Sequence, residues 1–179
     1  EDPTQHERAQ MLVAKTLADE GLMIALERDL PVNEDAIGPR ARKNQLPIHQ
    51  WVFAAPDGLS GPALDARIYD ALLKIEAIAY TDPTLAGLYP LSLSARTQVL
   101  KGRLNSWETI PFFKDLSDPD HCIHTMYFHT RFSTHTAPHP SMAQPFRHMA
   151  HNGEFNTDKK TRHSEPTPAT AAHTAILPP

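Results

Sequence analysis

Apolar residues recur at intervals of three and four near the start of the chain. The residues that share this helical face are Ala9, Leu12, Val13, Thr16 and Leu17. The spacing predicts an amphipathic helix, and Gly21 is the residue type that commonly follows a helix C-terminus. Residues 22–30 form a short segment that is rich in apolar residues and ends before Pro31. This pattern is typical of a strand.

The middle of the chain continues this alternation of helices and strands. Asn33 can cap a brief helix that extends to Arg42, and residues 48–54 have the composition of a buried strand. Pro62 suits a first helical turn. A longer amphipathic helix is marked by Leu64, Ile68, Leu72, Ile75 and Ala79. The order is therefore helix, strand, helix, strand, helix.

The sequence pattern changes after residue 88, where short segments of extended character are separated by proline and glycine. Four segments have strand character, namely residues 88–93, 97–100, 126–133 and 147–151. Strands that follow helices predict an α+β fold class. We expect residues 1–160 to form one domain and residues 161–179, rich in proline, alanine and threonine, to be a disordered or divergent tail.

Charge and composition exclude several function classes. The 17 basic and 21 acidic residues give a net charge of −4, which provides no electrostatic footprint for nucleic acid or for an anionic membrane. The sequence has no apolar run of membrane-spanning length, and its one cysteine cannot form an internal disulfide. We expect a cytoplasmic protein.

His121, Cys122 and His124 look at first like metal ligands. Zinc needs about four converging ligands, and strand alternation would place His121 on the face opposite the other two. We expect no metal site here, although a histidine-rich metal binder is an alternative function. Cys122 precedes a predicted strand among neutral histidines, so we expect it to be a buried or semi-buried, inert thiol.

Arg131 and the Asn152-Gly153 pair offer more specific chemistry. Alone, Asn-Gly predicts a hairpin turn, and a single arginine predicts a solvated surface group. Together they offer two kinds of donor. The guanidinium fork matches a carboxylate, and the two N–H groups of the Asn-Gly pair could form an oxyanion hole. If both open onto one cleft, the guanidinium and the Asn152 amide should lie about 8–12 Å apart across a bound glutamine.

Three segments around these residues carry a family resemblance: residues 131–134 (Arg-Phe-Ser-Thr), 143–146 (Ala-Gln-Pro-Phe) and 150–157 (Ala-His-Asn-Gly-Glu-Phe-Asn-Thr). They resemble the class II glutamine amidotransferases, and most of all the glutaminase domain of the glutamate synthase large subunit. Residues 28–32 and 92–102 also have counterparts in that family. The resemblance covers roughly residues 8–160.

The resemblance implies a partial four-layer αββα sandwich of the N-terminal nucleophile hydrolase type. In this family an N-terminal cysteine attacks the glutamine amide, and its own α-amine acts as the base. Arg131 would bind the α-carboxylate of glutamine, while Asn152 and the Gly153 N–H would form the catalytic oxyanion hole. Further residues of the implied pocket are Phe132, Thr134 and His135, the last at a position where glutamate synthases more often have asparagine.

The chain departs from the family at its start, which reads Glu1-Asp2-Pro3 with no cysteine. We therefore expect an internal fragment that is inactive alone and that binds glutamine beside a synthase-type domain in an intact protein. FMN and an iron–sulfur cluster are implied only for a full glutamate synthase, and no cofactor is expected in this chain. The alternative is a non-catalytic remnant that acts as a binding or structural module.

Overall fold

The computed structural model describes residues 3–130 together with Pro140 and Ala143. Its α-helices are α1 (Pro3–Asp19), α2 (Pro39–Lys43), α3 (Gly61–Thr81) and α4 (Thr109–Phe112). Its strands are β1 (Met23–Asp29) and β2 (His49–Ala54). Four 3₁₀ helices span Glu34–Ala36, Pro83–Leu85, Ser106–Glu108 and Lys114–Ser117. This mixture of helices and antiparallel strands agrees with the expected α+β class.

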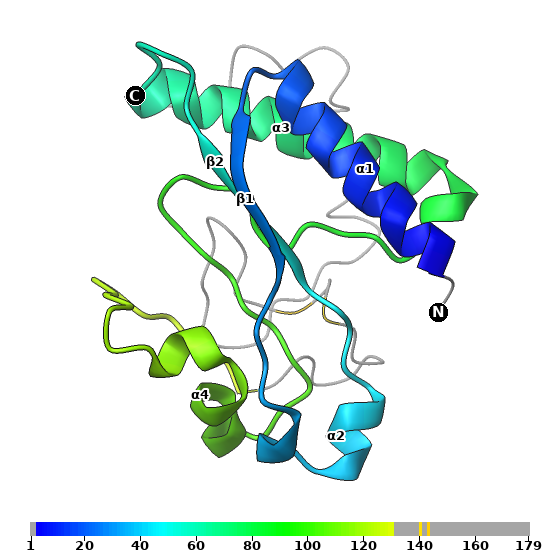
Figure 1. Cartoon of the computed structure of the whole chain (residues 1–179), viewed down its shortest axis with the longest axis vertical. Coiled ribbons are helices and arrows are strands. Elements are labelled where there is room, and N and C mark those ends of the chain that lie inside the picture. The colour runs from blue at the N-terminus through cyan, green and yellow to red at the C-terminus, as the bar shows by residue number, and fades with distance from the viewer. Residues whose placement is uncertain (1–2, 131–139, 141–142, 144–179) are drawn as a thin grey trace, which may run out of the picture.

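The two strands form an antiparallel ribbon that connects the two ends of the molecule (Figure 1). Helices α1 and α3 lie toward one end of the ribbon, and the short α2 and α4 lie at the other. The register pairs Met23 with Ala54 and Asp29 with His49, with an irregularity between Ile24 and Leu26. Because opposite residues of a ladder share a face, Asp29 and His49 project to the same side.

The larger core lies where α1 and α3 meet the ribbon. It consists of Val13, Leu17, Leu22, Ile68, Ala71 and Ile75. Leu17 and Leu22 have no exposed surface, and each such side chain contributes about 1.5–3 kcal/mol by leaving water. The apolar periodicity of the two predicted helices therefore marked the faces that pack here.

The turn from α1 into β1 has the geometry that its glycine predicts. Gly21 has a φ of 73°, a left-handed conformation that glycine adopts without a steric penalty. Its N–H donates to the Ala18 carbonyl at 2.9 Å, and the Leu22 N–H donates to the Leu17 carbonyl at 2.9 Å. This Schellman pattern satisfies carbonyls at the end of α1 and brings Leu22 against Leu17 in the core.

A second, smaller core lies at the opposite end of the ribbon. Its buried members are Leu30, Ile37, Phe112 and Phe113. The two phenylalanine rings meet edge to face with centroids 4.9 Å apart. A salt bridge between Arg28 of β1 and Asp115 connects this region to the ribbon. The short helices of residues 106–117 that build this core were not predicted, because each is too short to show a helical period.

Two predicted strands, residues 88–93 and 97–100, are wrong, because neither forms a strand. Serine side chains take the backbone donors that a ladder would have used. The Ser94 hydroxyl accepts from the Arg96 N–H at 3.1 Å, and the Ser92 hydroxyl accepts from the Val99 N–H at 3.1 Å. Such local bonds stabilise loop conformations in competition with a sheet.

The predictions for the C-terminal part are only partly tested. Residues 126–130 of the strand expected at 126–133 form no strand. The rest of that segment, residues 147–151 and the boundary at 160 lie outside the described residues. The four-layer sandwich is not confirmed. Among the described helices, none combines the length and apolarity needed to cross a membrane.

Candidate functional site

The glutamine pocket expected from the sequence falls on residues that the structure does not describe. These residues are Arg131, Phe132, Thr134, His135, Asn152 and Gly153. Their roles, and the distance of about 8–12 Å between guanidinium and amide, therefore stay predictions. What the structure describes is the surrounding framework and one anchor point within the motif region.

That anchor is Lys101, which is 9% exposed. Its ammonium donates to the Ala143 carbonyl at 2.6 Å and to the Pro140 carbonyl at 3.2 Å. Burial lowers the pKa of Lys101 below its ordinary value, because a charged amine loses hydration there. Ala143 begins the Ala-Gln-Pro-Phe motif and has no exposed surface. Lys101 thus holds the backbone at Pro140 and Ala143, which lie in the sequence between His135 and Asn152.

A cavity of about 1030 Å³ lies beside this anchor. Its walls come from α1, from both strands, from the segment between Leu85 and Arg103 and from Pro140. Trp51 contributes to the wall, and its buried indole N–H has no acceptor in the part of the chain that the structure describes. An unpaired buried donor is uncommon in folded proteins. The wall of the cavity therefore includes the apolar surface of Trp51, while the indole N–H itself is buried within the wall.

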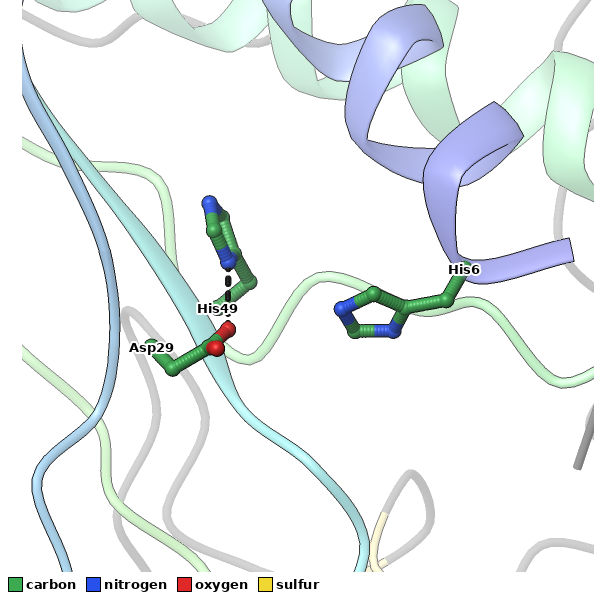
Figure 2. A group of neighbouring side chains, drawn as sticks. All are labelled: His6, Asp29 and His49. Carbon is green, nitrogen blue, oxygen red and sulfur yellow. Dashed lines mark hydrogen bonds and ion pairs between the residues drawn. The ribbon is translucent and has the colours of Figure 1, made fainter. Parts of the chain in front are cut away.

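A cluster of ligand-type side chains lies on the same wall, at the end of the ribbon that leads to α2, where the first turns of α1 approach it. One ligand atom from each of His6, Asp29 and His49 lies within 4.8 Å of the others. Figure 2 shows the His6 ring extending from α1 toward Asp29 and His49 on the two strands. His49 Nδ1 lies 2.7 Å from Asp29 Oδ1. No sequence signal identified this cluster, since its members are far apart in the chain and converge only through strand register and helix packing.

Cys122 corrects one expectation, because its thiol is exposed instead of buried. The stretch from His121 to Thr130 forms no strand and is mostly solvent-exposed, and the sulfur shares this exposure. His124 Nδ1 instead meets the neighbouring Thr125 hydroxyl at 2.8 Å. Among the described residues, the cluster of possible metal ligands is the one formed by His6, Asp29 and His49, not the 121–124 segment.

Comparison with known proteins gives the family. A family model of class-II glutamine amidotransferases matches residues 1–168. The chain is 36% identical over 157 residues to ferredoxin-dependent glutamate synthase 2 of Synechocystis sp., covering 88% of this chain and 10% of that protein. It is 35% identical over 132 residues to the glutamate synthase (NADPH) large chain of Azospirillum brasilense, covering 74% of this chain and 9% of that protein.

The chain therefore belongs to the class II glutamine amidotransferases. Within that family it is homologous to the glutaminase domains of glutamate synthase large subunits. A chloroplastic ferredoxin-dependent glutamate synthase of Oryza sativa subsp. japonica is 32% identical over 157 residues, which are 88% of this chain and 10% of that protein. The chain spans about a tenth of the length of these relatives.

Proposed function

We propose that this chain forms the glutamine-binding part of a glutaminase that releases ammonia and glutamate, for use in glutamate synthesis. The carrying observation is the family match over residues 1–168, which includes Arg131 and the Asn152-Gly153 pair. The named relatives are glutamate synthases. Glutamine is accordingly the proposed ligand, and a synthase-type domain is the proposed partner.

The proposed roles follow from the chemistry of the side chains. The Arg131 guanidinium can donate two parallel hydrogen bonds to the α-carboxylate of glutamine. The Asn152 amide and the Gly153 N–H are donors for the oxygen of the side-chain carbonyl as it becomes negative. Phe132, Thr134 and His135 complete the pocket. Lys101 supports it indirectly, because it fixes the backbone at Pro140 and Ala143.

The nucleophile is proposed to be a cysteine outside these 179 residues. Its α-amine would take the thiol proton, and the thiolate would attack the side-chain amide carbon. Ammonia would leave with the proton held by the resulting α-ammonium group, and water would then hydrolyse the thioester to glutamate and the free thiol. Cys122 does not fit that role, because it is internal to the chain and therefore has no free α-amine beside it. Its exposed position also gives it no desolvated pocket.

The cofactors of a full glutamate synthase are not required for this step. An iron–sulfur cluster is held by several cysteine thiolates, and this sequence has one cysteine, so its residues do not fit a cluster. Hydrolysis of an amide also involves no electron transfer. FMN and the cluster are therefore assigned to the synthase part of the relatives and not to this chain.

The second candidate is a non-catalytic remnant that keeps a glutamine or glutamate pocket as a binding module. It is favoured by the position of Cys122, the one thiol in the sequence, on an exposed segment. Both candidates bind glutamine. They differ in whether an added N-terminal cysteine segment restores ammonia release.

Titration calorimetry of the full chain with L-glutamine tests the binding that both candidates share. We expect saturable binding that Arg131→Ala weakens at least about tenfold, through loss of a charge-assisted contact. Arg40→Ala is the matched control, because Arg40 is exposed on α2. If glutamine fails to bind, or if both variants weaken it equally, the proposal is wrong. Ammonia release after fusion of a family cysteine segment then separates enzyme from remnant.

A further inference from the structure

We propose that His6, Asp29 and His49 bind a divalent first-row transition-metal ion, with Zn²⁺ as the representative case. Two imidazole nitrogens and a carboxylate oxygen are the donor set that such ions prefer in proteins. The ion would join α1 to both strands of the ribbon (Figure 2). All three residues belong to the part of the chain that the structure describes.

The cluster is assembled by regular structure rather than by loops. Asp29 and His49 are direct partners in the antiparallel register, so their side chains share a face at the end of the ribbon. His6 comes from the first turns of α1, and Gln10 lies one helical turn further along the same face. The Gln10 amide lies 3.0 Å from His6 Nε2 and 2.9 Å from His49 Nδ1. Four polar groups from three elements therefore converge.

The distances are close to those that a metal ion needs. Ligands at about 2.0–2.1 Å in a tetrahedron lie about 3.4 Å apart. The three ligand atoms already lie within 4.8 Å of one another, so no separation has to shrink by more than about 1.4 Å. The pair formed by His49 Nδ1 and Asp29 Oδ1, now 2.7 Å apart, has to open by about 0.7 Å. The Gln10 amide can turn by a half rotation to present its oxygen as a fourth ligand, or a water can take that position.

His49 is oriented as metal-bound histidines usually are. Its second nitrogen, Nε2, lies 3.1 Å from Glu27 Oε1, which matches the carboxylate that commonly accepts the free N–H of a metal-binding histidine. With that proton on Nε2, the lone pair of Nδ1 faces the Asp29 oxygen at 2.7 Å. Two lone pairs at that distance repel each other, and a bound cation would relieve the repulsion.

Charge and access also suit a cation. The carboxylates of Glu27 and Asp29 both flank His49, and the guanidinium of Arg28, the residue between them in β1, is paired with Asp115. The His49 side chain is 11% exposed while that of Asp29 is 78% exposed. One side of the cluster is thus shielded by protein, and the other is open for an ion to enter. The rival explanation is a doubly paired imidazolium, in which protons take the place of the metal ion.

Trp51 provides a local reporter, because its ring lies 4.5 Å from the His49 ring between centroids. The chain has two tryptophans, and Trp107 is 73% exposed, so Trp107→Phe leaves Trp51 as the single fluorophore. We expect Co²⁺ to quench this fluorescence saturably, and excess Zn²⁺ to reverse the quenching. Mg²⁺ should have no effect, because it prefers sites built from oxygen ligands.

Variants in the Trp107→Phe background decide the assignment. Asp29→Asn and His49→Gln should each weaken Co²⁺ quenching at least about tenfold, and His6→Gln should do the same. His124→Gln, an exposed histidine in contact with Thr125, is the matched control and should leave quenching unchanged. It also tests for binding by the 121–124 segment. Circular dichroism melts test whether each variant is folded. If His49→Gln does not fold, Asp29→Asn still tests the proposal, because asparagine has nearly the same size as aspartate.

Two results would overturn the proposal. Absence of Co²⁺ quenching in the Trp107→Phe chain would show that the cluster holds protons and not a metal ion. Quenching of equal strength in the folded Asp29→Asn and control variants would place the metal elsewhere in the chain. Zn²⁺ calorimetry provides the independent readout, with one site expected to disappear in Asp29→Asn.

Discussion

The ammonium of Lys101 donates a hydrogen bond to the carbonyl of Ala143, with 2.6 Å between nitrogen and oxygen. The same nitrogen donates to the Pro140 carbonyl at 3.2 Å. Both carbonyls belong to buried residues, so the amine satisfies groups that water cannot reach. A single side chain thus connects the segment after α3 to the region that carries the family motif.

Replacing Lys101 with methionine should destabilise the chain, because two buried carbonyls lose their donor. We expect a loss of about 1–3 kcal/mol in the free energy of unfolding, measured by urea denaturation. Lys15→Met is the control, since the Lys15 side chain is 75% exposed and forms only a surface pair with Asp19. Equal effects of the two substitutions would contradict a structural role for Lys101.

The lowered pKa of Lys101 makes a further prediction about pH. Burial holds the folded pKa below the ordinary 10.5, so between the two values the unfolded chain binds more protons than the folded chain. The free energy of unfolding should therefore rise with pH in the window just below 10.5. The difference between the wild-type chain and Lys101→Met isolates this effect. If the stability difference between the wild-type chain and Lys101→Met falls as the pH approaches 10.5, the pKa of Lys101 is raised instead of lowered in the folded chain.

Glu20 should be a stability determinant, because its side chain is 10% exposed and accepts from Lys74 of α3. The Arg67 guanidinium also donates to the Glu20 carbonyl at 3.1 Å. Glu20→Ala should reduce the free energy of unfolding by about 1–3 kcal/mol in urea denaturation, because it removes the carboxylate that pairs with Lys74 and Arg67 of α3, while the bond from Arg67 to the backbone carbonyl remains. The neighbouring Asp19→Ala should change it by less than about 1 kcal/mol, because that carboxylate is on the surface. Comparable losses of stability in Glu20→Ala and Asp19→Ala would contradict a specific stabilising role for Glu20.

Gly21→Ala should destabilise the turn between α1 and β1 because of backbone conformation alone. A Cβ atom would meet Pro56 Cγ at 3.6 Å, an ordinary contact, but the φ of 73° is strained for alanine. We expect a loss of about 1–2 kcal/mol in thermal or urea unfolding. Gly21→Asn should lose less, because asparagine tolerates this conformation better. A larger loss for asparagine than for alanine would point to steric crowding instead.

Two substitutions should separate binding from turnover in a chimaera that adds a family cysteine segment to this chain. Arg131→Ala should raise KM, because the carboxylate contact is present in both ground and transition states. Asn152→Ala should lower kcat by about 10²–10³, since its donor is aimed at charge that develops during the reaction. Ammonia release over a range of glutamine concentrations gives both constants. An unchanged kcat in Asn152→Ala would contradict the assignment of Asn152 to the oxyanion hole.

How far the sequence could predict the fold depended on the length of each periodic segment. Leu17 and Ile68 lie in helices long enough to repeat the apolar pattern several times, so their burial was foreseeable. Ser92 and Ser94 show the opposite case. Their hydroxyls accept hydrogen bonds from backbone N–H groups nearby, and the apolar residues around them gave no indication that the backbone would bond to side chains instead of a neighbouring strand.

The family also could be identified from the sequence, because short motifs such as residues 131–134 and 150–157 can be recognised from the order of residues alone. Charge and composition likewise needed no coordinates. These properties reside in the order of residues along the chain, and the helical and strand periods are local as well.

The tertiary structure alone decided which distant residues meet. Lys101 reaches Ala143 across the fold, and His6 approaches Asp29 and His49 only because α1 packs beside a ribbon of one particular register. A shift of that register by one residue would turn Asp29 or His49 to the other face. Such contacts depend on packing between elements, and local patterns of polarity carry no information about them.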